Sequence, residues 1–356
     1  MFTVIKRLED LTPDQLIAYI DKYPIAIPTE TVYGLASKIS NVSTLASVYT
    51  IKNRPADNPL IVHVSSLSML KSLVVEIPPA YRALIDRYWP GPLTLLFLKN
   101  EHVNDVVTCG SKYVGIRMPS NECARRIIEI TGPLAAPSAN ISGSISPSHA
   151  QHVYKDLAGK IELIVDDGPC KHGLESTIFT CYDGGNGAVL RPGAITQEMI
   201  ETVIGRGVAT GGCEMVPGKK YRHYAPTVPF YLFDCDDKMV AWMESSVDRH
   251  ECGILNGENC TNMAYSGKTS SLLVHGSAQS GLGVLVTSDA IKKFVISRNV
   301  RHIDLGRTKQ EISNGLYHGL RMLDGECACI CMVRVDRKNE GMAIMDRVNR
   351  AAGQLN

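Results

Sequence analysis

Apolar residues follow two different spacings along the first 204 residues, and these spacings predict the elements of secondary structure. Positions at helical spacing predict helices over 13–22, 41–52, 79–88, 120–130, 147–157 and 196–204. Short apolar runs predict strands over 23–29, 59–64, 93–98, 113–118, 134–138, 161–166, 175–182 and 187–191. Strands mixed irregularly with helices indicate an α/β domain around a twisted, partly antiparallel sheet.

This pattern breaks between residues 205 and 227, a stretch rich in glycine and proline without apolar periodicity. Such a composition is typical of a linker between domains. Tyr221, Arg222, His223 and Tyr224 nevertheless stand in it, and aromatic rings beside charged donors are unusual in a mere spacer. A solvated basic tether and a segment that takes part in binding are both consistent with this stretch.

A simpler alternation of strands and helices follows from residue 228 onward. Apolar runs predict strands over 229–234, 251–256, 271–276, 301–306 and 327–335, and helical spacing predicts helices over 237–247, 288–298, 308–323 and 342–351. The alternation indicates a smaller, Rossmann-like domain with a parallel sheet. The chain is therefore predicted to contain a domain over 1–204, a linker over 205–227 and a second domain over 228–356.

The overall charge excludes one class of function. Lys plus Arg number 37 and Asp plus Glu number 36, a net charge of +1 for 356 residues. A chain so balanced carries no positive coat, so tight non-specific binding of nucleic acid is not expected as its main role. Any positive charge that the function requires must be concentrated locally.

Cysteine usage and the apolar runs indicate a reduced, cytoplasmic protein without a membrane span. The first ten residues carry charges of both signs, and no run of about 18 apolar residues occurs. The eleven cysteines are an odd number and form no CxxC pair. Cys327, Cys329 and Cys331 alternate on one predicted strand face, where we favour small buried side chains over a metal or redox site.

Two histidines stand three residues apart at a predicted helix start. His149 and His152 follow Pro147 and Ser148, a spacing that admits a pair of metal ligands. A capped, exposed helix explains the same residues, and we favour it. His63, inside the apolar run 59–64, is in isolation read as a core histidine.

Two polar loops of the first domain carry stronger candidate chemistry. PTETVYGLA (28–36) places Thr29 and Thr31 directly after a strand, which suits either a small polar ligand or a strand-to-helix turn with a threonine cap. KNRPADNPL holds Lys52, Arg54 and Asn58 in a loop stiffened by prolines. A lysine point charge and a planar arginine suit polyphosphate oxygens, although a solvated surface loop remains an alternative.

A buried cation and a serine-rich loop complete the candidate site. Arg117 lies in the apolar segment VGIRMP, and a buried guanidinium needs either a protein carboxylate or an anionic ligand. The loop 136–147 carries Ser138 and Ser146 and could line a nucleotide site with hydroxyls and backbone N–H groups. Ser176 in ESTI and Arg191 in VLRPG extend this set. Together these residues predict a concave site that neutralises phosphates.

In this order, the motifs resemble those of one known family. PTETVYGLA, KNRPADNPL, WPGPLTLLF, VGIRMP, PLAAPSANISGSISPS, ESTI and LRPGAIT are similar to the YrdC-type threonylcarbamoyl-AMP synthases. VPGKKYRHYAP and GMAIMDRVNRAA resemble the longer, two-domain form of that family. The linker motif of that form commonly begins with serine and carries methionine where Val216 and Lys219 stand here.

The resemblance implies a fold, a reaction and roles for residues. It implies a YrdC-like mixed sheet, a linker and a Rossmann-like domain, and a nucleotidyltransferase that makes L-threonylcarbamoyl-AMP and pyrophosphate from L-threonine, bicarbonate and ATP. The residues implied for ATP are Lys52, Arg54, Asn58, Tyr113, Ser138, Ser146, Arg191 and Tyr224. Those implied for threonine are Thr31, His63, Arg117, Ala136 and Ser176.

The same resemblance implies partners and a mechanism without a covalent nucleophile. Mg²⁺ is expected with ATP, at ligands the sequence leaves unknown. A tRNA threonylcarbamoyl transferase complex would receive the product and modify the adenosine beside the anticodon, which leaves room for a weak contact with RNA. The linker residues Tyr221 to Tyr224 would close over the nucleotide. The alternative is a non-catalytic RNA-binding module with a YrdC-like fold, which the near-neutral charge disfavours.

Overall fold

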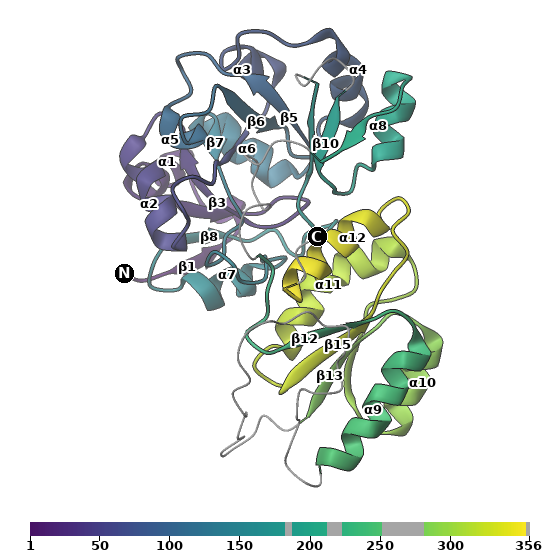
Figure 1. The fold of residues 1–356 in the computed structure, drawn as a ribbon. Coiled ribbons are helices and arrows are strands. Elements are labelled where there is room, and N and C mark those ends of the chain that lie inside the picture. The colour runs from purple at the N-terminus through teal and green to yellow at the C-terminus, as the bar shows by residue number, and fades with distance from the viewer. Residues whose placement is uncertain (182–186, 212–222, 251–280, 354–356) are drawn as a thin grey trace.

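The computed structural model describes residues 1–181, 187–211, 223–250 and 281–353, and these form two bodies, each built on its own sheet (Figure 1). The first body holds a mixed sheet in the order β1-β8-β2-β3-β7-β4-β6-β5-β9-β10-β11. Its strands are β1 (Val4–Lys6), β2 (Ile25–Ile27), β3 (Gly34–Lys38), β4 (Ile61–His63), β5 (Leu93–Leu98), β6 (Tyr113–Arg117), β7 (Leu134–Ala135), β8 (Leu163–Val165), β9 (Thr177–Thr180), β10 (Ala188–Arg191) and β11 (Ala209–Thr210). Parallel pairs such as β4–β6 and antiparallel pairs such as β5–β6 confirm the predicted mixed sheet.

The helices of the first body pack apolar faces against this sheet. They are η1 (Leu8–Asp10), α1 (Pro13–Lys22), α2 (Val42–Lys52), α3 (Leu67–Lys71), α4 (Pro79–Tyr88), α5 (Asp105–Thr108), α6 (Glu122–Thr131), α7 (Ala150–Leu157) and α8 (Gln197–Ile204). Helix α1 starts at a capping box in which the Thr12 hydroxyl accepts from the Gln15 amide. Its Leu16 and Ile20, one turn apart, are buried against the core.

A parallel sheet forms the second body, as the alternating pattern predicted. The strands β12 (Phe230–Phe233), β13 (Leu282–Val286), β14 (Arg301–Asp304) and β15 (Cys329–Val333) stand in the order β12-β15-β13-β14. Its helices are α9 (Asp236–His250), α10 (Asp289–Ser297), α11 (Lys309–Leu323) and α12 (Gly341–Ala351). All of the strand pairs are parallel. The strands predicted over 251–256 and 271–276 lie outside the described residues, as do Tyr221 and Arg222.

Three segments differ from the prediction. The threonine-rich stretch after β2 does not enter a helix but turns back into β3, which pairs antiparallel with β2. Strand β13 was not predicted, because glycines at 281 and 283 flank its first residue and weaken the apolar signal. Strand β11 adds to the first sheet from within the segment 205–227, so that segment begins as part of the first body.

The predicted capped, exposed helix at the histidine pair is wrong. Helix α7 begins at Ala150 with His149 as N-cap, and the His149 side chain makes no capping hydrogen bond. His152 is buried rather than exposed. Since a solvated surface was expected here, the burial of His152 and the partial burial of His149 show that another part of the chain covers the start of this helix.

Helix α11 covers it, since Arg321 of α11 forms an ion pair with Asp156 of α7 and His318 lies against His152. Helices α11 and α12 both lie between the two sheets (Figure 1). One apolar cluster contains Val32 and Ile145 of the first body together with Tyr317 and Ile344 of the second. Tyr224, near the start of the described residues 223–250, belongs to the same cluster. The two bodies therefore share a core at their junction, and Tyr224, near the end of the 205–227 segment, packs into it.

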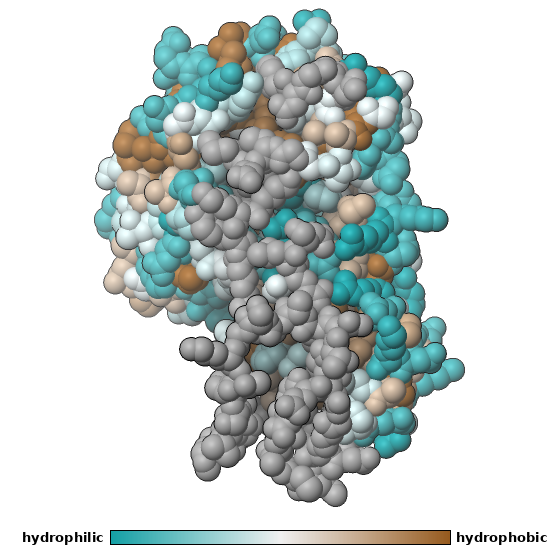
Figure 2. Space-filling view, in the orientation of Figure 1, coloured by the Kyte–Doolittle hydropathy of each residue, from teal (hydrophilic) through white to brown (hydrophobic). Residues whose placement is uncertain are grey.

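The cysteines of the second body and the exposed surface match the predictions made from the sequence. Cys327, Cys329 and Cys331 are buried, as expected for small apolar side chains. On the face shown in Figure 2, outside the grey residues, hydrophilic residues predominate and hydrophobic ones lie in separate groups. Within the described parts of the chain, no helix is both long and apolar enough to cross a membrane.

Candidate active site

A pocket opens where the first sheet meets the junction with the second body. Its walls come from β4, β6, β10 and the loops after β2, α2, β7 and before β9, together with the end of the 205–227 segment. Nine of the thirteen predicted ligand-binding residues line this pocket: Thr31, Arg54, His63, Arg117, Ala136, Ser138, Ser176, Arg191 and Tyr224. Segments that are far apart in the sequence are thus brought to one concave site.

Arg117, at the end of β6, occupies one side of the pocket. Its Nη2 lies 2.7 Å from Oε2 of Glu30, and both side chains are almost completely buried. Its Nη1 donates to the Thr31 hydroxyl at 2.9 Å, and that hydroxyl lies 2.9 Å from the Thr29 hydroxyl. The sequence predicted either a protein carboxylate or an anionic ligand as the partner of Arg117, and the structure provides a protein carboxylate. The guanidinium still lines the pocket.

His63 stands beside Arg117 because β4 and β6 are parallel neighbours with these two residues in register. Burial, with the nearby Arg117 charge, lowers the pKa of His63 to about 3. The ring is therefore neutral near pH 7. It can act as a hydrogen-bonding group toward a ligand, but it is too weak a base for efficient proton abstraction at that pH.

Two further cations, Arg54 and Arg191, line the pocket. Arg54 donates from Nε and Nη2 to the backbone and side-chain oxygens of Asn58, at 2.9 and 2.8 Å, which folds the proline-rich loop around it. Arg191 donates from Nη2 to the Ser176 hydroxyl at 3.1 Å. Burial lowers the pKa of Arg54 to about 10, and the neighbouring Arg191 charge adds to this. Two close arginines make this side suited to an anion, which would relieve their repulsion.

Four predicted residues do not line the pocket, and three of them support its walls. Lys52 is buried and donates from Nζ to the backbone oxygens of Ser138 and Asn140, at 2.5 and 2.6 Å. Asn58 accepts a hydrogen bond from Arg54, and the Ser146 hydroxyl donates one to Glu175 at 2.6 Å. Lys52 is thus placed to hold the serine-rich loop in position, since its donors point to that loop and not into the pocket.

Tyr113 lies elsewhere. It lines a separate, smaller cavity with Thr94 and Gly115 beneath β5 and β6. The structure does not bring its side chain to the main pocket. Backbone groups near Tyr113, which the resemblance implied for the nucleotide, stay a prediction.

Tyr224 closes the pocket from the side of the second body. Its φ of 64° places it in the left-handed region, which non-glycine residues adopt rarely and only where contacts hold them. Its ring stacks on Tyr317 with centroids 5.6 Å apart, and Arg347 lies 5.4 Å from its centre. The Ala225 amide donates to the Gly143 carbonyl, which fixes the chain just after it to the serine-rich loop.

Two residues beside the pocket are not among those predicted from the sequence: Glu175, which lines it, and Arg347, which pairs with Glu175. Glu175, in ESTI, accepts hydrogen bonds from Ser146, Tyr317 and Arg347. Arg347 has no exposed side-chain surface. A signal was present in GMAIMDRVNRA, where an arginine falls on the apolar stripe between Ile344 and Val348. Its partner, 172 residues earlier, could not be read from that stripe.

The pocket lacks free carboxylate groups among its described residues that could bind a magnesium ion. Mg²⁺ is usually held by one or two carboxylates together with phosphates and water. The carboxylates at this wall, Glu30 and Glu175, are each paired with an arginine. The lining residues therefore do not form a magnesium site by themselves, and no catalytic step is assigned to such an ion here.

Comparisons with known proteins agree with this geometry. Residues 21–193 match the Sua5, YciO and YrdC family, described as Telomere recombination, and residues 195–353 match the family described as Threonylcarbamoyl-AMP synthase, C-terminal domain. The structure superposes on Pyrococcus abyssi Sua5 complexed with L-threonine with a TM-score of 0.80 and 34% identity, covering 99% of this chain and 97% of that one.

Relatives match over nearly the whole chain. The Threonylcarbamoyl-AMP synthase of Pyrococcus abyssi is 36% identical over 342 residues, which cover 92% of this chain and 90% of the relative. That of Bacillus subtilis is 37% identical over 341 residues, covering 92% and 89%. Since both domains and their order are matched at this identity, the chain belongs to the threonylcarbamoyl-AMP synthase family.

Proposed function

We propose that this enzyme synthesises L-threonylcarbamoyl-AMP and pyrophosphate from L-threonine, bicarbonate and ATP, and so acts as a nucleotidyltransferase. The observation that carries the proposal is the convergence of Arg54, Arg117 and Arg191 on one pocket, where hydroxyls of Thr31 and Ser176 accompany them. Three cations and two hydroxyls suit a triphosphate and an amino acid held together. The names of the relatives favour this reaction over a non-catalytic RNA-binding module.

Two sides of the pocket suit two different substrates. Arg54 and Arg191 lie close enough for their charges to repel, and phosphates would be stabilised between them. Arg117 is already neutralised by Glu30, so its side of the pocket is less positive and suits a smaller, zwitterionic ligand. We assign the nucleotide phosphates to the arginine pair, and threonine to the side formed by Thr31, His63 and Arg117.

The reaction can proceed without a covalent bond to the protein. The threonine amine attacks the bicarbonate carbon, water leaves, and an oxygen of the resulting carbamate attacks the α-phosphorus of ATP as pyrophosphate departs. Arg54 and Arg191 would stabilise the charge on the departing pyrophosphate. His63, neutral near pH 7, would orient the amino acid rather than remove its proton.

Exclusion of water is the remaining requirement, because a carbamate and a mixed anhydride both decompose in water. His223 and Tyr224 line the pocket from the segment that joins the two bodies. Tyr224 is buried, and its backbone is fixed beside the serine-rich loop. These residues would cover the bound nucleotide, and the mixed anhydride would then pass to a tRNA-modifying transferase.

Pyrophosphate release tests the proposal. The full chain should release pyrophosphate from ATP only when threonine and bicarbonate are both present, and mass spectrometry should detect the adenylate. Serine in place of threonine is the matched control for substrate choice. Release that is indifferent to threonine or to bicarbonate would contradict the assignment.

A further inference from the structure

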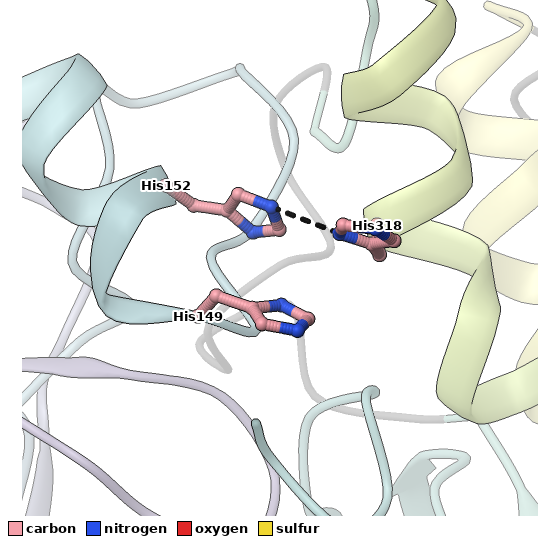
Figure 3. A group of neighbouring side chains, drawn as sticks. All are labelled: His149, His152 and His318. Carbon is pink, nitrogen blue, oxygen red and sulfur yellow. Dashed lines mark hydrogen bonds between the residues drawn. The ribbon is translucent and has the colours of Figure 1, made fainter. Parts of the chain in front are cut away.

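Three histidines from two bodies meet beside helix α7, outside the pocket. Figure 3 shows that the rings of His149 and His152, at the start of α7, and of His318, on α11, face the same space. One candidate ligand atom from each ring can be chosen so that all three lie within 4.8 Å of one another. His152 and His318 are stacked with an interplanar angle of 23°. Residues 166 positions apart in the sequence thus share one small volume.

The spacing of these atoms suits a metal ion. Nε2 of His152 lies 3.3 Å from Nδ1 of His318. Two nitrogens bound to one tetrahedral zinc at its usual bond length stand about 3.3 Å apart, so this pair already has the required separation. His149 is only partly buried and lies at the helix N-cap, where its ring can turn toward the other two.

Hydrogen bonds define which ring protons a metal would displace. The Ser148 amide donates to Nδ1 of His152 at 3.2 Å, so in the neutral ring the proton is on Nε2 and is directed at Nδ1 of His318. A metal at this position replaces that proton, and the His152 proton moves to Nδ1 at the expense of the long Ser148 bond. Nδ1 of His149 lies 3.0 Å from the Ser148 hydroxyl, which leaves its Nε2 available as a ligand.

The surroundings hold the two helices together and balance nearby charge. Arg321 of α11 forms an ion pair with Asp156 of α7, with Nη2 and Oδ2 2.7 Å apart and both side chains largely buried. This pair holds together the two helices that carry the histidines, and Asp156 neutralises the charge of Arg321 between them.

We propose that His149, His152 and His318 form a binding site for one borderline divalent transition-metal ion, such as Zn²⁺, which links α7 of the first body to α11 of the second. Imidazole nitrogens favour Zn²⁺ and its neighbours over Mg²⁺ and Ca²⁺. Three protein ligands leave a fourth position for water. The ion would act as a clamp between the bodies and does not depend on the proposed reaction.

Binding of Co²⁺ and Zn²⁺ to the metal-free, full-length protein tests the site. Co²⁺ gives a visible absorption spectrum that distinguishes nitrogen and oxygen ligands from thiolates, which add a near-ultraviolet charge-transfer band. We expect one equivalent of Co²⁺ to bind without that band and to be displaced by Zn²⁺. Zn²⁺ should also raise the unfolding temperature of the protein, because it binds only the folded junction.

Two variants and one control decide the assignment. His318→Gln and His149→Gln should each weaken Co²⁺ affinity by more than about 10-fold, the cost that loss of a group supporting a ligand already carries. His302→Gln, a histidine on β14 outside the group, should bind as the wild type does. Circular dichroism establishes whether each variant is folded. If His318→Gln does not fold, His149→Gln alone tests the site. No binding at micromolar Co²⁺, a thiolate band, or equal affinity in the folded variants would overturn the proposal.

Discussion

Arg347 of α12 and Glu175 of the first body form an ion pair in which Nε lies 2.9 Å from Oε2, with side chains only 0% and 9% exposed. The same carboxylate accepts from the hydroxyls of Ser146 and Tyr317. Arg347 also lies against the ring of Tyr224. The second body thus contacts the pocket wall through one buried polar network, which gives that body a defined part in shaping the site.

Loss of Arg347 should destabilise the protein strongly. Arg347→Met leaves Glu175 buried without its cation, which we expect to lower the free energy of unfolding by about 3–5 kcal/mol. Urea denaturation at pH 7 measures this. Arg350→Met is the matched control, because Arg350 pairs with Asp346 nearer the surface and should contribute about 1 kcal/mol or less. Equal effects of the two substitutions would contradict the role of the buried pair.

The effect of this substitution should depend on pH with a definite sign. Burial raises the pKa of Glu175, but the charges of Arg347 and Arg191 outweigh it and hold the pKa below its ordinary value. In the wild type the carboxylate therefore adds stability above its unfolded pKa and loses it as the pH falls through the folded value. Without Arg347, burial raises the pKa of Glu175 in the folded protein above its unfolded value. The protonated carboxyl is then the tolerated form, and the variant loses stability as the pH rises and Glu175 ionises.

The difference in unfolding free energy between wild type and Arg347→Met should consequently grow between about pH 4.5 and about pH 8. Denaturation curves at several pH values measure it. For Arg350→Met the difference should stay nearly constant over the same range. A difference for Arg347→Met that shrinks with rising pH would mean that Glu175 is not the group left uncompensated.

Tyr224 should matter through its ring rather than its hydroxyl. Tyr224→Phe keeps the stack on Tyr317 and the contact with Arg347, so kcat/KM for ATP should change by less than about threefold. Tyr224→Ala removes both contacts and should lower kcat/KM by about 100-fold, the scale for a misplaced positioning group. Steady-state kinetics and a thermal unfolding curve separate the effect on activity from folding. Wild-type turnover in a folded Tyr224→Ala would contradict the covering role.

Arg54 should act on ATP rather than on threonine. Arg54→Met removes a charged donor from the arginine pair and should raise KM for ATP by roughly 10- to 100-fold, as expected for a charged hydrogen bond. KM for threonine should change little. Arg126→Met, which alters an exposed residue of α6, is the control for removing an arginine. An equal rise of both KM values would mean that Arg54 maintains the shape of the whole pocket and does not act on ATP in particular.

Gly173 should control how the second body docks. At its φ of +71° an added Cβ would lie 2.7 Å from the backbone oxygens of Ser313 and Asn314 on α11. Gly168 has a similar φ of +77° with nothing within 4 Å of such a Cβ. Gly173→Ala and Gly168→Ala therefore share the backbone strain of about 1 kcal/mol, and only the first adds a collision. Limited proteolysis should cut Gly173→Ala faster at the junction, and equal rates would contradict this.

The periodic elements and the charged loops of the first body were predictable from the sequence. The helix over 13–22 and the strand over 93–98 have the predicted bounds, because one apolar face or run dominates each segment. Arg117 stands out in the sequence because a cation in an apolar segment needs a partner, and Arg54 because a planar guanidinium beside Lys52 suits phosphate oxygens. Arg191 extends that set. The resemblance of the ordered motifs then implied one shared site, in which most of the predicted residues do lie together.

Tertiary structure alone decided which partner each of these groups has. Sequence showed that Arg117 needs a counter-charge but not that Glu30 provides it, and it gave no sign that Glu175 joins Ser146 to Arg347. The spacing of His149 and His152 favours a solvated helix end, and only the fold brings His318 against them. The reason is physical: local spacing determines which face of an element is apolar, whereas a buried charge or ring is satisfied by whatever group packing brings within a few ångströms.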